Sequence, residues 1–139
     1  MSDADALIEQ IRTSVTTVFP GVTVDDWAEG ASRVIYFVPP NEDGASVTVT
    51  IGESVVVEAM FFSENLAEHG DLETQTTMAI GIILSLADHG LAKVTYGIRG
   101  FPFSETTYGP AAGFWGIDEF ALSVLRPRVQ VLSPWAVLD

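Results

Sequence analysis

The first apolar residues of the chain recur at helical spacing. Between positions 7 and 19 they are separated by one, three or four residues, the spacing of one face of an amphipathic helix. Ser2 or Asp3 can cap this helix, because each places a side-chain oxygen near the first backbone N–H groups. Pro20 and Gly21 follow, and we expect the helix to end there.

The pattern then changes to that of strands. Segment 22–32 has one large apolar side chain, a tryptophan, and predicts no regular element, whereas 34–38 is a β-branched and aromatic run typical of a strand. Turn residues follow, and 46–51 alternates apolar and polar positions, as a half-buried strand does. After a short connection, 55–62 predicts a third strand.

Both faces of this third predicted strand are largely apolar. We therefore expect it to be central in its sheet, covered on both sides or covered on one side by a partner. Glu58 is the exception, because it lies between Val56 and Met60. Two interpretations of Glu58 are open: a sheet-edge residue that reaches water, or a buried functional acid.

The second helix has the clearest signals in the chain. Asp71 is its expected cap and Gly90 its expected end, and the residues between are apolar nearly all round. Such a helix suits packing across a sheet and against another subunit. Strands are predicted at 93–98 and 128–132, and 117–125 fits either a short helix or a strand.

Taken together, these elements predict a single α+β domain over residues 1–139. We expect a mainly antiparallel sheet packed by the long helix, in the order helix, three strands, helix, two strands. A chain of 139 residues buries about two thirds of its unfolded surface and so forms a core without a metal or disulfide. The chain has no cysteine, which excludes disulfides and thiol chemistry and favours a reducing compartment.

The net negative charge of the chain limits the kinds of partner that it can bind. The chain has 19 Asp and Glu against 6 Lys and Arg, a net charge of −13, and no Lys or Arg between Val34 and Ala92. This opposes binding to nucleic acid or an anionic membrane and favours a basic partner protein. With an acidic N-terminus and no apolar run of about 20 residues, a cytoplasmic protein is the expectation.

Seven of the fourteen aromatic residues fall between Tyr96 and Phe120, interspersed with glycine and proline. We interpret 97–116 as a long loop. It either completes the core or supplies a surface that anchors a partner. The predicted binding residues combine this segment with the acid of the third strand: Phe101, Phe103, Tyr108, Phe114, Trp115 and Glu58.

Both histidines lie in similar five-residue segments that end in Glu68-His69-Gly70 and Asp88-His89-Gly90. We interpret each as the end of a helix, since the two segments lack the same-face spacing of a helical metal motif. The chain contains no P-loop, no dinucleotide-binding glycine motif and no nucleophile elbow. The sequence therefore predicts no catalytic residue, no metal and no cofactor.

The order of the predicted elements resembles that of type III secretion chaperones and YbjN-like proteins. The residues that carry the resemblance are the helix at 3–19, the strands within 34–62 with their Gly52-Glu53 connection, and the helix at 72–89. The resemblance implies a small acidic protein that binds partner proteins, often as a homodimer. The chain departs from the group at 134–139, where no clear final helix is predicted.

Immunity proteins of toxin systems are also small, acidic and α+β, which is an analogy at the level of fold. The combined expectation is a non-catalytic module that binds another protein through its acidic surface and its aromatic segment. The alternative expectation is a small-molecule-binding protein or small enzyme with a pocket under the segment 97–116.

Overall fold

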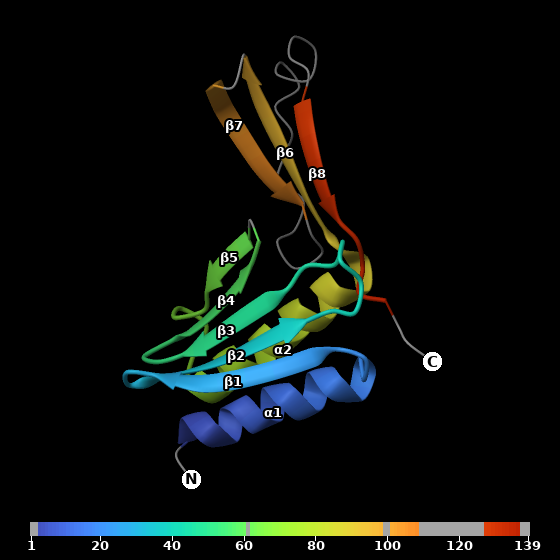
Figure 1. Cartoon of the computed structure of the whole chain (residues 1–139). Helices are drawn as coiled ribbons and strands as arrows, with labels where there is room; N and C mark the ends of the chain where they lie inside the picture. The colour runs from blue at the N-terminus through green and yellow to red at the C-terminus, as the bar shows by residue number, and fades with distance from the viewer. Residues whose placement is uncertain (1–2, 61, 99–100, 109–126, 137–139) are drawn as a thin grey trace.

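The computed structural model describes residues 3–60, 62–98, 101–108 and 127–136. Its helices and strands follow one another as shown in Figure 1: α1 (Asp3–Val18), β1 (Thr23–Glu29), β2 (Ser32–Val38), β3 (Val47–Ile51), β4 (Val55–Ala59), β5 (Phe62–Asn65), α2 (Leu72–His89), β6 (Leu91–Ile98), β7 (Phe101–Tyr108) and β8 (Pro127–Leu132).

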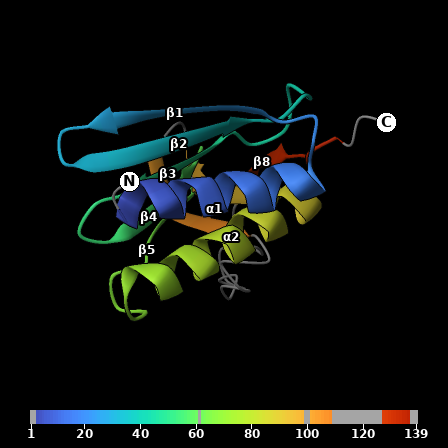
Figure 2. The same ribbon diagram turned by 90° about the horizontal axis from the view of Figure 1, so that it is seen from below.

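Strands β1 to β5 form one antiparallel sheet in their chain order. Helices α1 and α2 both pack on one face of this sheet, as the view from below makes plain (Figure 2). This arrangement confirms the predicted fold class, α+β with a mainly antiparallel sheet covered by the long helix. Both helices also begin and end close to the predicted residues.

The hydrophobic core lies between the helices and that face of the sheet. Strands β3 and β4 bury alternate residues against the helices, which is the consequence of the two-residue period of a strand. Strand β2 buries Ile35 and Phe37 in the same way, and Val34 is also buried, on the opposite face of the sheet. The fully buried members include side chains from both helices and three strands: Ile8, Ile11, Val15, Ile35, Phe37, Val47, Val49, Val55, Val57 and Ile83.

Five strands, not three, lie between the two helices. Segment 22–32 contains β1, an edge strand whose burial pattern is almost wholly exposed, so the chain shows no apolar alternation there. The predicted strand 55–62 is two strands, because a turn at Met60 separates β4 from β5. The turn contains no glycine or proline, so the sequence does not predict it.

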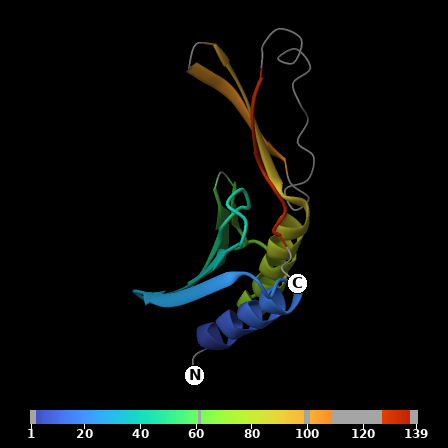
Figure 3. The same ribbon diagram turned by 45° about the vertical axis from the view of Figure 1, so that its right-hand side comes forward.

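A second antiparallel sheet, in the order β7-β6-β8, extends away from the end of α2 (Figures 1 and 3). Strand β7 corrects the prediction that 97–116 is a loop throughout, since Phe101–Tyr108 pairs with β6 along its length. Pro102 is compatible with this strand because β7 is at the edge of its sheet and the register shifts beside Gly97. Residues 117–125 lie outside the described part of the chain.

The segment that follows β8 packs back against the first sheet. It brings the C-terminal part of the chain into contact with the end of α1. The side chain of Trp135 is 3% exposed and packs edge-to-face on Phe19, with ring centroids 5.4 Å apart. It also lies against Phe37. Its indole N–H donates to the carbonyl of Ala45 at 2.7 Å, and its backbone N–H donates to the carbonyl of Ala87 at 2.7 Å.

Polar contacts hold the same segment to the turn before β3. The Ser133 hydroxyl donates to the Asp43 carboxylate at 2.7 Å. The Asn41 side chain donates to the Pro134 carbonyl at 3.0 Å and accepts from the Ala136 N–H at 2.8 Å. Hydrogen bonds from Ser133 and Asn41 hold the pKa of Asp43 below its usual value. We call residues 133–136 the clasp.

Gly90 ends α2 directly beneath the clasp. Its φ of +81° lies in the left-handed region, and a Cβ placed on it would come within 2.4 Å of the Leu132 carbonyl oxygen. Only glycine fits there without a shift of the backbone. Gly81, in the middle of the same helix, has open space around the position of a Cβ.

We expect Trp135→Ala to lower the free energy of unfolding by about 3–5 kcal/mol, because it removes a buried ring and leaves the Ala45 carbonyl without its donor. Trp27→Ala removes the same side chain from a site that is 40% exposed, and we expect a loss below about 1 kcal/mol. Urea unfolding followed by circular dichroism measures both. Equal losses would contradict the role of the clasp.

Gly90→Ala and Gly81→Ala should change stability in opposite directions. The first variant is expected to lose more than about 1 kcal/mol through the contact with Leu132 and the positive φ. The second should gain about 0.5–1 kcal/mol, since alanine is the better helix former at an unobstructed position. Thermal unfolding of the pair provides the measurement, and a stabilised Gly90→Ala would be incompatible with this packing.

Candidate functional site: the open face of the five-stranded sheet

The sheet has a second face that no described element covers (Figure 3). Directly paired residues of neighbouring strands share a face, so the strand register identifies what this face carries. One row across the five strands consists of Trp27, Val34, Thr50, Val56 and Asn65, and the next consists of Asp25, Tyr36, Thr48, Glu58 and Ser63. We call this surface the open face.

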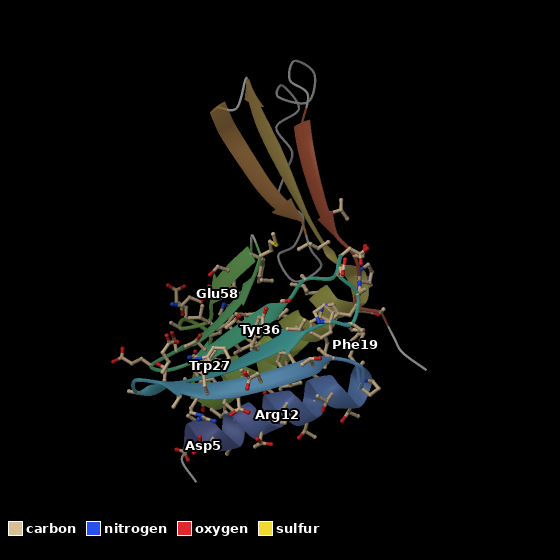
Figure 4. All side chains as sticks on the ribbon, in the orientation of Figure 1. Asp5, Arg12, Phe19, Trp27, Tyr36 and Glu58 are labelled. Carbon is tan, nitrogen blue, oxygen red and sulfur yellow. The ribbon has the colours of Figure 1, made fainter. Side chains whose placement is uncertain are left out.

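Aromatic and apolar side chains are exposed on and beside the open face. Trp27 is 40% exposed on β1, and Met60, in the turn after β4, is 80% exposed. Tyr36 is half-buried on β2, the strand next to the edge strand β1. Figure 4 shows Trp27, Tyr36 and Glu58 on the strands of this sheet, with Asp5 and Arg12 on α1 below it.

A hollow of about 670 Å³ lies at the end of the open face nearest to β8. Its floor contains Tyr36, Thr48, Glu58 and Ser63, which are four members of the second row. Its rim comes from the turn before β3, the turn after β4 and the last residue of β8: Glu42, Gly44, Ala45, Ser46, Met60 and Leu132. The hollow is therefore lined by residues with hydroxyl groups, carboxylates and apolar side chains, and by the two aromatic residues Tyr36 and Phe62.

The open face is negatively charged. Asp25, Glu29 and Glu58 lie on it, Glu42 lies on its rim, and the described part of the face carries no Lys or Arg. None of the ion pairs among the described residues includes Glu58. The carboxylate of Glu58 thus faces solvent without a basic neighbour in this part of the chain.

The two basic side chains that the sheet region does contain lie on its other face. Arg33 pairs with Asp26 at 2.7 Å and with Asp5 of α1 at 3.0 Å. Arg12 of α1 pairs with the same Asp26 and with Glu9, at 3.2 Å from the latter. This half-buried cluster ties α1 to β1 and β2, and it keeps both arginines away from the open face.

Asp25 and Asp26 therefore have different environments although they are neighbours. Asp25 is exposed on the open face, where its carboxylate accepts the Asp26 backbone N–H at 2.9 Å. Asp26 is paired with two arginines beneath the sheet. Neighbouring side chains of a strand point to opposite faces, so β1 divides this pair between the two faces of the sheet.

The predicted binding residues do not form one cluster in the described structure. Glu58 lies on the open face and is exposed, which excludes the interpretation of a buried acid; β4 is an interior strand, so Glu58 is not at a sheet edge either. Phe101, Phe103 and Tyr108 belong to β7 of the second sheet. Phe114 and Trp115 lie outside the described residues.

Trp27, Tyr36 and Met60 were not among the predicted site residues. Trp27 is the sole large apolar residue of segment 22–32, and the structure leaves it on the surface. Tyr36 lies inside an apolar run, and only the strand register places it in one row with Glu58. The sequence predicts neither the turn at Met60 nor the exposure of its side chain.

The two histidine segments also differ. His89 is in the last turn of α2, as predicted, and pairs with the exposed Asp88 at 3.3 Å. His69 lies in a turn region where no helix ends, which corrects the prediction for the first segment. Within the described ranges, no three His, Asp or Glu side chains are grouped so as to hold a metal ion.

At the start of α2, Asp71 caps the helix by accepting the Thr74 backbone N–H at 2.8 Å, and hydrogen bonds from Thr74 hold the pKa of Asp71 below its usual value. This carboxylate caps the helix and belongs to neither row of the open face. Neither described helix has the length and apolar character needed to cross a lipid bilayer.

Comparison of the chain with protein-family models, curated proteins and solved structures finds no match.

We expect Asp26→Asn to lower the free energy of unfolding by about 1–3 kcal/mol, because it leaves Arg12 and Arg33 half-buried beside a neutral amide. Asp25→Asn is the matched control. It changes the adjacent residue, keeps an oxygen for the Asp26 N–H, and should alter stability by no more than about 0.5 kcal/mol. Equal effects in urea unfolding would argue against the division of this pair between the two faces.

Proposed function

We propose that this chain is a non-catalytic binding protein whose open face docks a basic segment of a partner protein. The observation that carries the proposal is the sheet face that no described element covers, with Trp27 and Tyr36 on it and Met60 beside it. Aromatic residues and methionine are enriched where proteins bind one another.

Charge complementarity supports the nature of the partner. The described open face and its rim carry Asp25, Glu29, Glu42 and Glu58 without a basic side chain, and the whole chain has a net charge of −13. A partner with a basic segment would be attracted over long distances, whereas an acidic partner would be repelled.

The aromatic segment remains part of the proposal as a second anchor. Phe101, Phe103 and Tyr108 would contribute from β7, and Phe114 and Trp115 from the segment that follows it. As in the chaperone-like and immunity-like proteins that the chain resembles, the bound form would be a complex with one partner, with a homodimer as a further element of the proposal. The proposed location is the cytoplasm, which suits a chain without cysteine.

The second candidate function is the binding of a small molecule, and the hollow at the end of the open face favours it. Its volume of about 670 Å³ is in the range of ligand pockets, and hydroxyl and carboxylate groups converge in it. A thermal-shift screen separates the two candidates. A ligand at 100 times its Kd stabilises the folded chain by about 2.7 kcal/mol.

Capture from the native extract tests the main proposal. We expect the tagged chain to retain one stoichiometric basic protein at low salt and to release it as the salt concentration rises, since charges separated by solvent are screened. Phe114→Ala and Trp115→Ala should weaken capture by severalfold without lowering the midpoint of thermal unfolding.

The outcomes of this experiment are distinct. An equal loss of capture and thermal stability in those two variants would place the aromatic rings in the core instead of at an anchor. If no specific protein is retained at either salt concentration, and a small molecule raises the unfolding temperature, the second candidate function replaces the first.

A further inference from the structure

Within the open face, we infer that a notch between Tyr36 and Glu58 binds the guanidinium group of an arginine from the partner protein. This inference rests on the proposed function and specifies its chemistry. It arises from three neighbouring residues of the second row, Tyr36 on β2, Thr48 on β3 and Glu58 on β4, which all line the hollow.

The register sets the shape of the notch. Tyr36 is paired directly with Thr48, and Thr48 directly with Glu58, so the ring and the carboxylate are two strands apart with a small side chain between them. Neighbouring strands are about 4.8 Å apart, which places the two outer Cα atoms about 10 Å from each other. A planar group fits above Thr48, with the ring on one side and the carboxylate on the other.

The charges at this point favour a cation. Glu58 is exposed and belongs to none of the ion pairs among the described residues. The hydroxyl oxygens of Thr48 and Ser63 flank it in the same row and can accept hydrogen bonds. Arg12 and Arg33 cannot fill the notch, because both are paired with Asp26 on the opposite face of the sheet.

The chemistry favours arginine over lysine. A guanidinium presents several N–H donors in a planar fork that matches a carboxylate, and it stacks on an aromatic ring. Lysine offers a compact charge that is strongly hydrated and does not stack in the same way. The placement of Tyr36 and Glu58 on either side of Thr48 therefore discriminates between two residues that carry the same charge.

The surroundings point to a protein segment as the source of the arginine. Exposed Met60 and Trp27 lie on either side of the second row, and Asp25 lies at the far end of that row. Free arginine would occupy the notch alone, whereas a peptide would also contact these side chains. The bound segment should therefore be an arginine-containing stretch with further basic residues that face Asp25 and Glu29.

Calorimetric titration of the full chain with two peptides of equal charge, N-acetylated hexa-arginine and hexa-lysine, tests the inference. We expect the arginine peptide to bind about tenfold more tightly. Glu58→Gln should lower its affinity about tenfold. Glu53→Gln removes an equal charge from the turn between β3 and β4, and should change the affinity by less than about twofold.

Substitutions of Tyr36 provide an independent test of the inference. Tyr36→Phe keeps the ring and should keep the preference for the arginine peptide, whereas Tyr36→Leu should reduce that preference severalfold. The thermal midpoint of each variant is measured alongside, because Tyr36 is half-buried. Should one variant unfold, the comparison of Glu58→Gln with Glu53→Gln still decides the matter.

Three results would overturn the inference. Equal affinities for the two peptides, with equal effects of Glu58→Gln and Glu53→Gln, would mean general attraction to an acidic face and leave the proposed function standing. Absence of binding by either peptide to the wild-type chain would remove the docking face as well. Binding of free arginine amide as tight as that of the peptide would reassign the notch to a small molecule.

Discussion

Packing of both helices on one face of the five-stranded sheet is the constraint on which the rest of this structure depends. A strand alternates its side chains between two faces, so one-sided burial leaves half of the residues of each strand outside the core. Ile35 and Val49 lie beneath the sheet with the helices, and Tyr36 and Thr48 lie above it. The open face is thus a direct consequence of where α1 and α2 pack.

The same constraint determines which charged side chains lie on each face of the sheet. Asp26 points toward α1 and is neutralised by Arg12 and Arg33, while its neighbour Asp25 points the other way and has no arginine. Two of the six Lys and Arg residues of the chain therefore form ion pairs beneath the sheet. The acidic character of the open face follows from this distribution as much as from the composition.

The clasp has a different role, because it joins parts that are distant along the chain. Trp135 contacts Phe19 after α1, Phe37 on β2 and the backbone at Ala87 near the end of α2. Ser133 of the clasp also holds the turn at Asp43, whose neighbours Glu42 and Gly44 belong to the rim of the hollow. The stability of the core and the shape of the proposed site are in this way connected.

The sequence by itself determined the two helices and the α+β class, because helical spacing, the cap at Asp71 and the stop at Gly90 are local signals. It also determined the acidic character of the surface and the exclusion of the enzyme motifs considered. The burial of Trp135 is non-local, because Phe19 and Phe37 lie far away from it in the chain. Strand β1 and the turn at Met60 involve neighbouring segments, but β1 has no apolar alternation and the turn has no glycine or proline to indicate it. Only the tertiary structure aligned Tyr36 with Glu58, since strand register is set by pairing between segments and not by either segment alone.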